Sequence, residues 1–211
     1  MPFVKLGMTV LALVVASGVE AASRKVIEPL DPAVVANLQV VAVDVEVAET
    51  AKANFDKFET KAAEKRVAAG LQPVDPSVAP SARPPESQYS TLPFRQMFTL
   101  VMEDVTREWG LSSGTPVRLK VTLDTVKTAN AGMAILAGSS DQLAGLVEVS
   151  DMENGRALGS FYIDVINSHG GLAGLAMRGS GIREELADEF ALESSRVLAG
   201  RKSKKPKAAK S

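Results

Sequence analysis

The sequence predicts an α+β fold, a two-layer domain with helices packed on one face of a mainly antiparallel sheet of about four strands. Three extended segments with alternating apolar residues lie between residues 116 and 167. An Asn154-Gly155 turn joins the last two, and segments with helical periodicity lie on either side of this run. Consecutive strands joined by turns pair as an antiparallel meander, which leaves the helices to cover one face.

The first strand is predicted at residues 38–47, after an extended leader over residues 22–36 in which Pro29 and Pro32 prevent a stable helix. Apolar residues at every second position share one face of this strand and the alternate residues share the other, the pattern of a half-buried strand. The first face holds Val41, Val43, Val45 and Val47, and the second holds Ala42, Asp44 and Glu46.

Residues 48–86 are interpreted as an insertion made of a helix and a proline-rich linker. Residues 48–69 lack Gly and Pro and have high helix propensity, and Gly70 ends the helix. Its apolar stripe is thin (Phe55, Phe58 and Ala62), so we expect this helix to lie loosely on the domain or to project from it. Five prolines between residues 72 and 86 predict a semi-extended linker.

A second helix is predicted from Leu92 to Trp109, with Pro93 in its first turn and Gly110 as its C-terminal cap. Its apolar residues recur at spacings of three and four, and Trp109 is interpreted as a core anchor. These residues are Phe94, Phe98, Val101, Val105 and Trp109.

The remaining strands are predicted at residues 116–126, 143–150 and 157–167, and a final helix covers 183–199 before Gly200. In the strand at 116–126, Val117, Leu119, Val121 and Leu123 are expected to point inward. A single domain is thus predicted over residues 37–200.

Residues 1–21 are typical of a secretory signal peptide. Lys5 precedes an apolar run, and small residues precede Ala22, so cleavage is expected near Ala21. An uncleaved membrane anchor is the alternative, but the apolar run is shorter than the roughly 20 residues that span a bilayer. The chain has no cysteine, which excludes disulfides and a lipidated cysteine. We therefore expect a periplasmic protein that is soluble or peripherally attached.

The net charge of −1 hides an asymmetry. Residues 22–200 hold 17 basic and 24 acidic side chains, whereas the tail at 201–211 has only basic charges. Such a tail favours an anionic membrane or lipopolysaccharide in an exported protein, and a disordered solubilising tail is the alternative. Nucleic acid is not expected as a partner. The basic residues are Arg201, Lys202, Lys204, Lys205, Lys207 and Lys210.

Catalytic chemistry finds little support in the sequence. His169 is the only histidine, and no G-x-S-x-G elbow occurs to hold a nucleophile. One histidine without cysteine does not build an ordinary zinc site. The glycine-rich stretch at 168–181 lacks the third glycine of a dinucleotide fingerprint, because Glu184 stands there. No catalytic residue, metal or cofactor is predicted.

Two acidic clusters are interpreted as solvated helix faces. One consists of Glu103, Asp104 and Glu108, and the other of Glu184, Glu185, Asp188 and Glu189.

Two apolar, glycine-bearing loops form the candidate interaction surface. Their apolar side chains are expected to pack on the sheet edge, on each other or on a partner. The residues are Met133, Ile135 and Leu136 in one loop and Leu172, Leu175 and Met177 in the other.

The segments "VRLKVTL", "LVEVSDMENGRALGSFYIDVINSHGG" and "REELADEFALESSRVLAG" together resemble a broad group of bacterial envelope proteins. These look distantly like the domains of the curli-secretion lipoprotein and the penicillin-binding-protein activator. The resemblance covers residues 37–200 in order and pattern, and it is specific only from residue 116 onward. It implies a non-enzymatic envelope module that works through partners and carries over no catalytic residue.

Three functions remain open at this point. The leading hypothesis is an exported, non-enzymatic accessory domain that binds an envelope protein. The second is a periplasmic carrier of a small apolar ligand, and the third is a hydrolase that uses His169.

Overall fold

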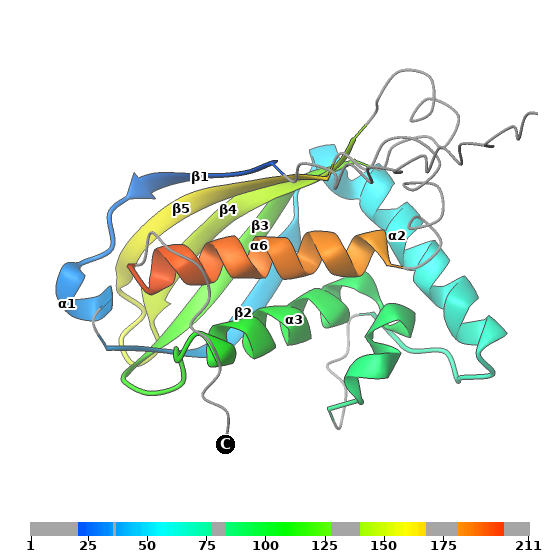
Figure 1. Cartoon of the computed structure of the whole chain (residues 1–211), viewed down its shortest axis with the longest axis horizontal. Coiled ribbons are helices and arrows are strands. Elements are labelled where there is room, and N and C mark those ends of the chain that lie inside the picture. Colours follow the sequence, from blue (N-terminus) through cyan, green and yellow to red (C-terminus); the bar gives the residue numbers. More distant parts are fainter. Residues whose placement is uncertain (1–20, 36, 77–82, 128–139, 168–180, 201–211) are drawn as a thin grey trace, which may run out of the picture.

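The computed structural model describes residues 21–35, 37–76, 83–127, 140–167 and 181–200. Over these residues the chain forms one five-stranded sheet with helices across one face (Figure 1). The strands are β1 (Ala21–Glu28), β2 (Leu38–Val47), β3 (Thr115–Lys127), β4 (Asp141–Asp151) and β5 (Ala157–Asn167). The helices are α1 (Pro32–Val35), α2 (Glu49–Ala68), the 3-10 helix η1 (Glu86–Thr91), α3 (Phe94–Glu108) and α6 (Ile182–Leu198).

The α+β class is confirmed, but the predicted strand number and pairing need correction. The sheet has the order β1-β5-β4-β3-β2, and its fifth strand is β1, from the segment expected as an extended leader. β1 pairs antiparallel with β5, whereas β2 runs parallel to β3. The sheet is therefore mixed. The parallel pair arises because α2, η1 and α3 lie between β2 and β3 and return the chain to the end of the sheet where it started.

The other strands match the predicted pattern closely. β2 and β5 have the predicted bounds, and β4 and β5 form an antiparallel hairpin. Gly155 has a φ of 71°, the left-handed conformation that the turn requires. One predicted side chain is misplaced: a register shift between Val40 and Ala42 leaves Val41 42% exposed, because a bulge turns it off the inner face.

The core lies between the sheet and helices α3 and α6, which run side by side across it (Figure 1). The inward residues of β3 are fully buried, as predicted, and so are Phe94 and Phe98 on the predicted face of α3, whereas Val101 of that face is half-buried. Phe98 contacts Phe94 in a tilted arrangement and Phe190 of α6 edge to face, with ring centroids 5.9 and 5.3 Å apart. Trp109, predicted as a core anchor, is 2% exposed.

Helix α2 is packed more firmly than its thin apolar stripe suggests. Ala51, Phe55, Phe58 and Ala62 are buried, and the rings of Phe55 and Phe58 contact Phe94. Figure 1 shows the last turns of α2 beyond the end of the sheet, where Val67 is 68% exposed. The helix is packed on the core from Ala51 to Ala62, and its last turns extend beyond the sheet.

None of the helices in the described ranges is long and apolar enough to cross a membrane.

Candidate functional site

Every residue of the predicted interaction surface and tail lies outside the described residues, and so does His169. The sites described below are therefore new positions. Within the described ranges, no three histidine, aspartate or glutamate side chains are grouped to hold a metal ion.

Two of the three acids in the cluster on α3, Glu103 and Asp104, form ion pairs and are half-buried, so this face is less solvated than predicted. Arg83 contacts Glu103 at 2.8 Å and Asp104 at 2.5 Å, and Tyr89 donates a hydrogen bond to Asp104. Burial opposes ionisation of Asp104, but the hydrogen bonds from Arg83 and Tyr89 outweigh it and lower the pKa of this carboxyl. These acids fix the segment around Arg83 onto α3.

The start of α6 holds a buried guanidinium that the sequence pattern did not reveal. Arg183 is 6% exposed and donates to the carbonyl oxygens of Phe58, Ser90 and Leu92, at 3.0, 3.2 and 3.4 Å. It thus ties α6 to α2 and to the segment before α3. Of the nearby acids, Asp188 is exposed while Glu184, Glu185 and Glu189 are half-buried, so this face is only partly solvated.

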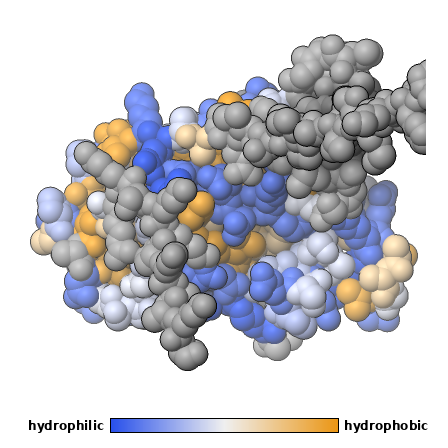
Figure 2. All heavy atoms as spheres, viewed as in Figure 1, coloured by the Kyte–Doolittle hydropathy of each residue, from blue (hydrophilic) through white to orange (hydrophobic). Residues whose placement is uncertain are grey.

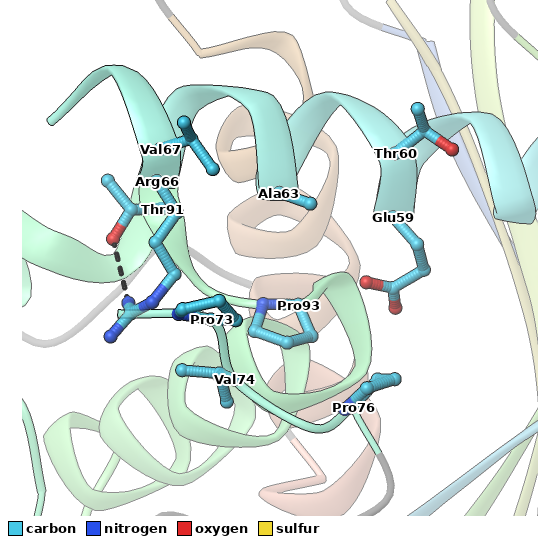
Figure 3. Close-up of a pocket in the computed structure, with 10 residues that line it drawn as sticks. All are labelled: Glu59, Thr60, Ala63, Arg66, Val67, Pro73, Val74, Pro76, Thr91 and Pro93. Carbon is cyan, nitrogen blue, oxygen red and sulfur yellow. Dashed lines mark hydrogen bonds between the residues drawn. The ribbon is translucent and has the colours of Figure 1, made fainter. Parts of the chain in front are cut away.

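An apolar pocket of about 410 Å³ lies between the second half of α2 and the returning linker (Figure 3). Its apolar lining consists of Ala63, Val67, Pro73, Val74, Pro76 and Pro93, and its polar lining consists of Glu59, Thr60, Arg66 and Thr91. Small-molecule sites begin at about 300 Å³, so a small apolar ligand fits this volume.

The two charged side chains of this pocket hold its walls together. The Glu59 carboxylate accepts hydrogen bonds from the backbone N–H groups of Phe94 and Arg95 and so caps α3. Burial raises the pKa of Glu59, and these two hydrogen bonds offset part of that rise. Arg66 donates to Gln72 O and to Thr91 Oγ1, the second bond drawn dashed in Figure 3. The pocket thus offers a ligand mainly apolar contact.

A larger groove of about 890 Å³ follows the outer edge of β2, which we call the β2 groove. One wall is the strand itself, from Val43 to Glu46, and the other is the flank of α3. The lining on α3 comprises Arg95, Gln96, Thr99, Leu100 and Glu103, and Pro76, Arg83, Arg118, Lys120 and Ser150 complete it.

Among the described residues, no backbone partner is found beyond the start of β2 on the side that faces this groove. Ala48 N donates to Leu123 O across the β2–β3 pair, so the alternate residues Val43 and Val45 direct their N–H and C=O groups away from β3. No described strand lies beyond β2 in the sheet. Within the described ranges this edge is covered at its start, where Val40 N donates to Leu111 O.

One row of charges on the open face of the sheet alternates in sign from strand to strand. Lys120 of β3 lies between Glu148 of β4 and Asp44 of β2 in the register. Lys120 Nζ contacts Glu46 at 3.0 Å, which raises the lysine pKa, and Arg118 contacts Asp44 at 3.2 Å. The series ends on the two acids of β2 at the sheet edge. The alternation within each strand was visible in the sequence, but its alignment across strands depends on the pairing.

The helical side of the molecule differs from the charged open face of the sheet in its distribution of apolar atoms. Figure 2 shows hydrophilic atoms over much of α6 and α3, with apolar atoms between the helices, at the end where β1 and α1 lie and at the end where α2 lies. Val26 and Ile27 of β1 are 52% and 49% exposed there.

Comparison with known proteins finds no matching family model and no matching curated protein. Solved structures give remote likenesses. The PelC dodecamer from Paraburkholderia phytofirmans has a TM-score of 0.35 and 10% identity, covering 88% of this chain and 100% of that chain. A candidate lipoprotein from Caulobacter crescentus CB15 has a TM-score of 0.31 and 16% identity, covering 49% and 81%. Lipoprotein GNA1162 from Neisseria meningitidis has a TM-score of 0.25 and 18% identity, covering 72% and 97%.

Two of these structures are of lipoproteins. At such TM-scores the likenesses carry no function, so we build the proposal below on the chain's own residues.

Proposed function

We propose that this chain is an exported, non-enzymatic accessory domain of the cell envelope that binds a protein partner through the β2 groove. The observation that supports it most is the unpaired edge of β2 beside a groove of about 890 Å³. An exposed strand edge is a template for pairing with another chain. Export rests on the signal-like residues 1–21, and the absence of enzymatic activity rests on the lack of a catalytic constellation in the sequence.

In-cell photocrosslinking tests this proposal. A photoreactive residue replaces Val41, which is 42% exposed on β2, and in a matched variant it replaces Val26, which is 52% exposed on the opposite edge strand. We expect an adduct with an envelope protein, identified by mass spectrometry, from Val41 and not from Val26. If neither position gives an adduct with an envelope protein, the proposal is wrong.

A second candidate function, a carrier of a small apolar ligand, is favoured by the apolar pocket between α2 and the linker. It predicts a co-purified ligand in native mass spectra. Ala63→Phe fills the pocket and should abolish that ligand, whereas Ala68→Phe, on the same helix but outside the lining, should retain it. A ligand-free wild-type spectrum would exclude this function.

We also propose that the basic tail binds anionic envelope surfaces. Deleting residues 201–211 should weaken binding to vesicles that contain phosphatidylglycerol, with the largest difference at low salt. Equal binding of both proteins at low salt would refute a role for the tail.

A further inference from the structure

We propose that the partner segment bound in the β2 groove is an extended strand in which apolar residues alternate with lysine or arginine. This rests on the proposed function and names the chemistry of its partner. Such a strand would pair with the backbone of β2, direct its apolar residues toward α3 and direct its basic residues to the open face of the sheet.

The backbone supplies the first argument. Beyond the covered start at Val40, Val43 and Val45 direct their N–H and C=O groups into the groove. Their side chains, 7% and 6% exposed, are already packed on the helical side. A strand can therefore add to this edge without displacing any side chain of the core.

Charge supplies the second argument. Asp44 and Glu46 leave 54% and 58% of their side-chain surface exposed although each contacts a base on β3. A strand added beyond β2 would place every second side chain next to these two acids. Basic residues there would continue the alternation in sign that runs from β4 through β3 to β2, and opposite charges on neighbouring strands stabilise pairing.

The same acids argue against a second copy of this chain as the partner. The free stretch of the edge is centred on Val45. Antiparallel pairing of two copies about that residue would place Asp44 of each copy opposite Glu46 of the other. Like charges directly opposite each other destabilise a strand pair. The edge thus disfavours pairing with its own copy and selects a basic strand.

The groove also has a side that suits the apolar residues of the partner. The residues Thr99, Leu100 and Gln96 of α3 and Pro76 line it on the helical side of the sheet. Arg95, Arg83 and Glu103 line the same side, and Arg83 already pairs with Glu103 at 2.8 Å. Apolar side chains of the partner therefore fit against the four uncharged side chains, between these charged groups.

A direct test uses the mature protein, residues 22–211, and a capped peptide of the sequence Val-Lys-Val-Lys-Val-Lys-Val. We expect the peptide to slow hydrogen exchange at the amides of Val43 and Val45. The double variant Asp44→Asn, Glu46→Gln should weaken binding about tenfold at low salt, because two cross-strand charge pairs are lost. Glu148→Gln is the matched control: it removes an exposed acid from the same face, away from the edge, and should change the affinity less than twofold.

Two further peptides exclude general attraction to an acidic protein. A peptide with glutamate in place of lysine, and one with the same composition but consecutive lysines, should each fail to protect Val43 and Val45. The proposal would be overturned if all three peptides bound equally well. It would also be overturned if Glu148→Gln weakened binding as much as the double variant does, or if the protein dimerised through this edge. An envelope partner crosslinked from Val26 alone, with no peptide protection at β2, would refute strand addition and the use of the β2 groove, and would leave the accessory role in the envelope standing. Peptide protection at β2 without any envelope adduct would support strand addition at this edge and refute the envelope function.

Discussion

On the face of the sheet that α3 and α6 cover, β3 presents Val117, Leu119 and Val121, none of which is exposed. On the open face the alternate residues Arg118 and Lys120 each keep 46% of their side-chain surface in water. Burial of apolar area dominates folding, whereas exposed ion pairs contribute little. The covered face therefore supplies most of the stability of the fold, and the open face and its edge remain accessible to a binding partner.

The largest expected effect comes from breaking the covered face. Phe98→Ala should lower the free energy of unfolding by about 3–5 kcal/mol, because a fully buried ring between Phe94 and Phe190 is lost and a cavity remains. Urea denaturation of both proteins measures this. Phe98→Leu, which keeps much of the volume, should cost clearly less. A loss below 1 kcal/mol for the alanine variant would contradict our placement of the core.

The next largest effect is expected at Arg183, which holds the helical layer together. Arg183→Met should cost about 3 kcal/mol, because carbonyl oxygens of Phe58, Ser90 and Leu92 lose their charged donor in a buried site. Arg183→Lys keeps the charge but not the planar fork of donors, so it should recover only part of the loss. Chemical denaturation distinguishes the two. Full recovery with lysine would show that charge alone matters there.

A smaller effect is expected on the open face at Tyr162, whose hydroxyl donates to Asp124 Oδ1 at 2.8 Å. Burial, then this hydrogen bond, raises the pKa of Tyr162 to about 12. Because the raised pKa favours the neutral form in the folded state, this contribution is complete below pH 10 and is lost as the pH rises from 10 to about 12. Tyr162→Phe should cost about 1 kcal/mol at pH 7 and remove that pH dependence.

Absorbance at 295 nm, which measures phenolate, checks the same prediction directly because the chain has only two tyrosines. The pKa of the other tyrosine, Tyr89, is raised as well, first by burial and then by its hydrogen bond to Asp104. In the folded protein, phenolate should form above pH 10 at both residues. A Tyr162 transition at or below pH 10 would contradict the geometry.

The smallest effect is expected at the exposed charges. Arg118→Ala removes a contact to Asp44 in which both side chains are about half exposed, so stability should change by no more than about 0.5 kcal/mol. Thermal unfolding measures this. A loss above 1.5 kcal/mol would show that the open face stabilises the fold and would remove the contrast between the two faces.

Local pattern was enough to place most elements. β2 and β5 have the predicted bounds because period-two alternation and β-branched residues act within a few positions. The inward residues of β3 and the buried face of α3 follow from the same periodicity. By contrast, Ala21–Glu28 has no clean alternation, and it is a strand because β5 offers it a partner edge.

The candidate site was far less accessible to the sequence. Asp44, Glu46, Arg118 and Lys120 are ordinary outward residues when each strand is considered alone. Their charges line up across strands only when β2 pairs parallel with β3. That pairing depends on α2 and α3, which carry the chain back across the sheet between the two strands. The burial of Arg183 is hidden from the sequence for a similar reason, since the three carbonyl oxygens that accept from it lie about 90 or more positions away.

The sequence alone determined the class of fold, the apolar face of each long element and the hairpin at Asn154-Gly155, because these depend on interactions between residues near in the chain. Only the tertiary structure decided the strand order, the bulge that exposes Val41 and the position of β2 at an open edge beside α3. Those features depend on which distant segments meet, and the alternation of a single strand is the same at an edge as in the middle of a sheet.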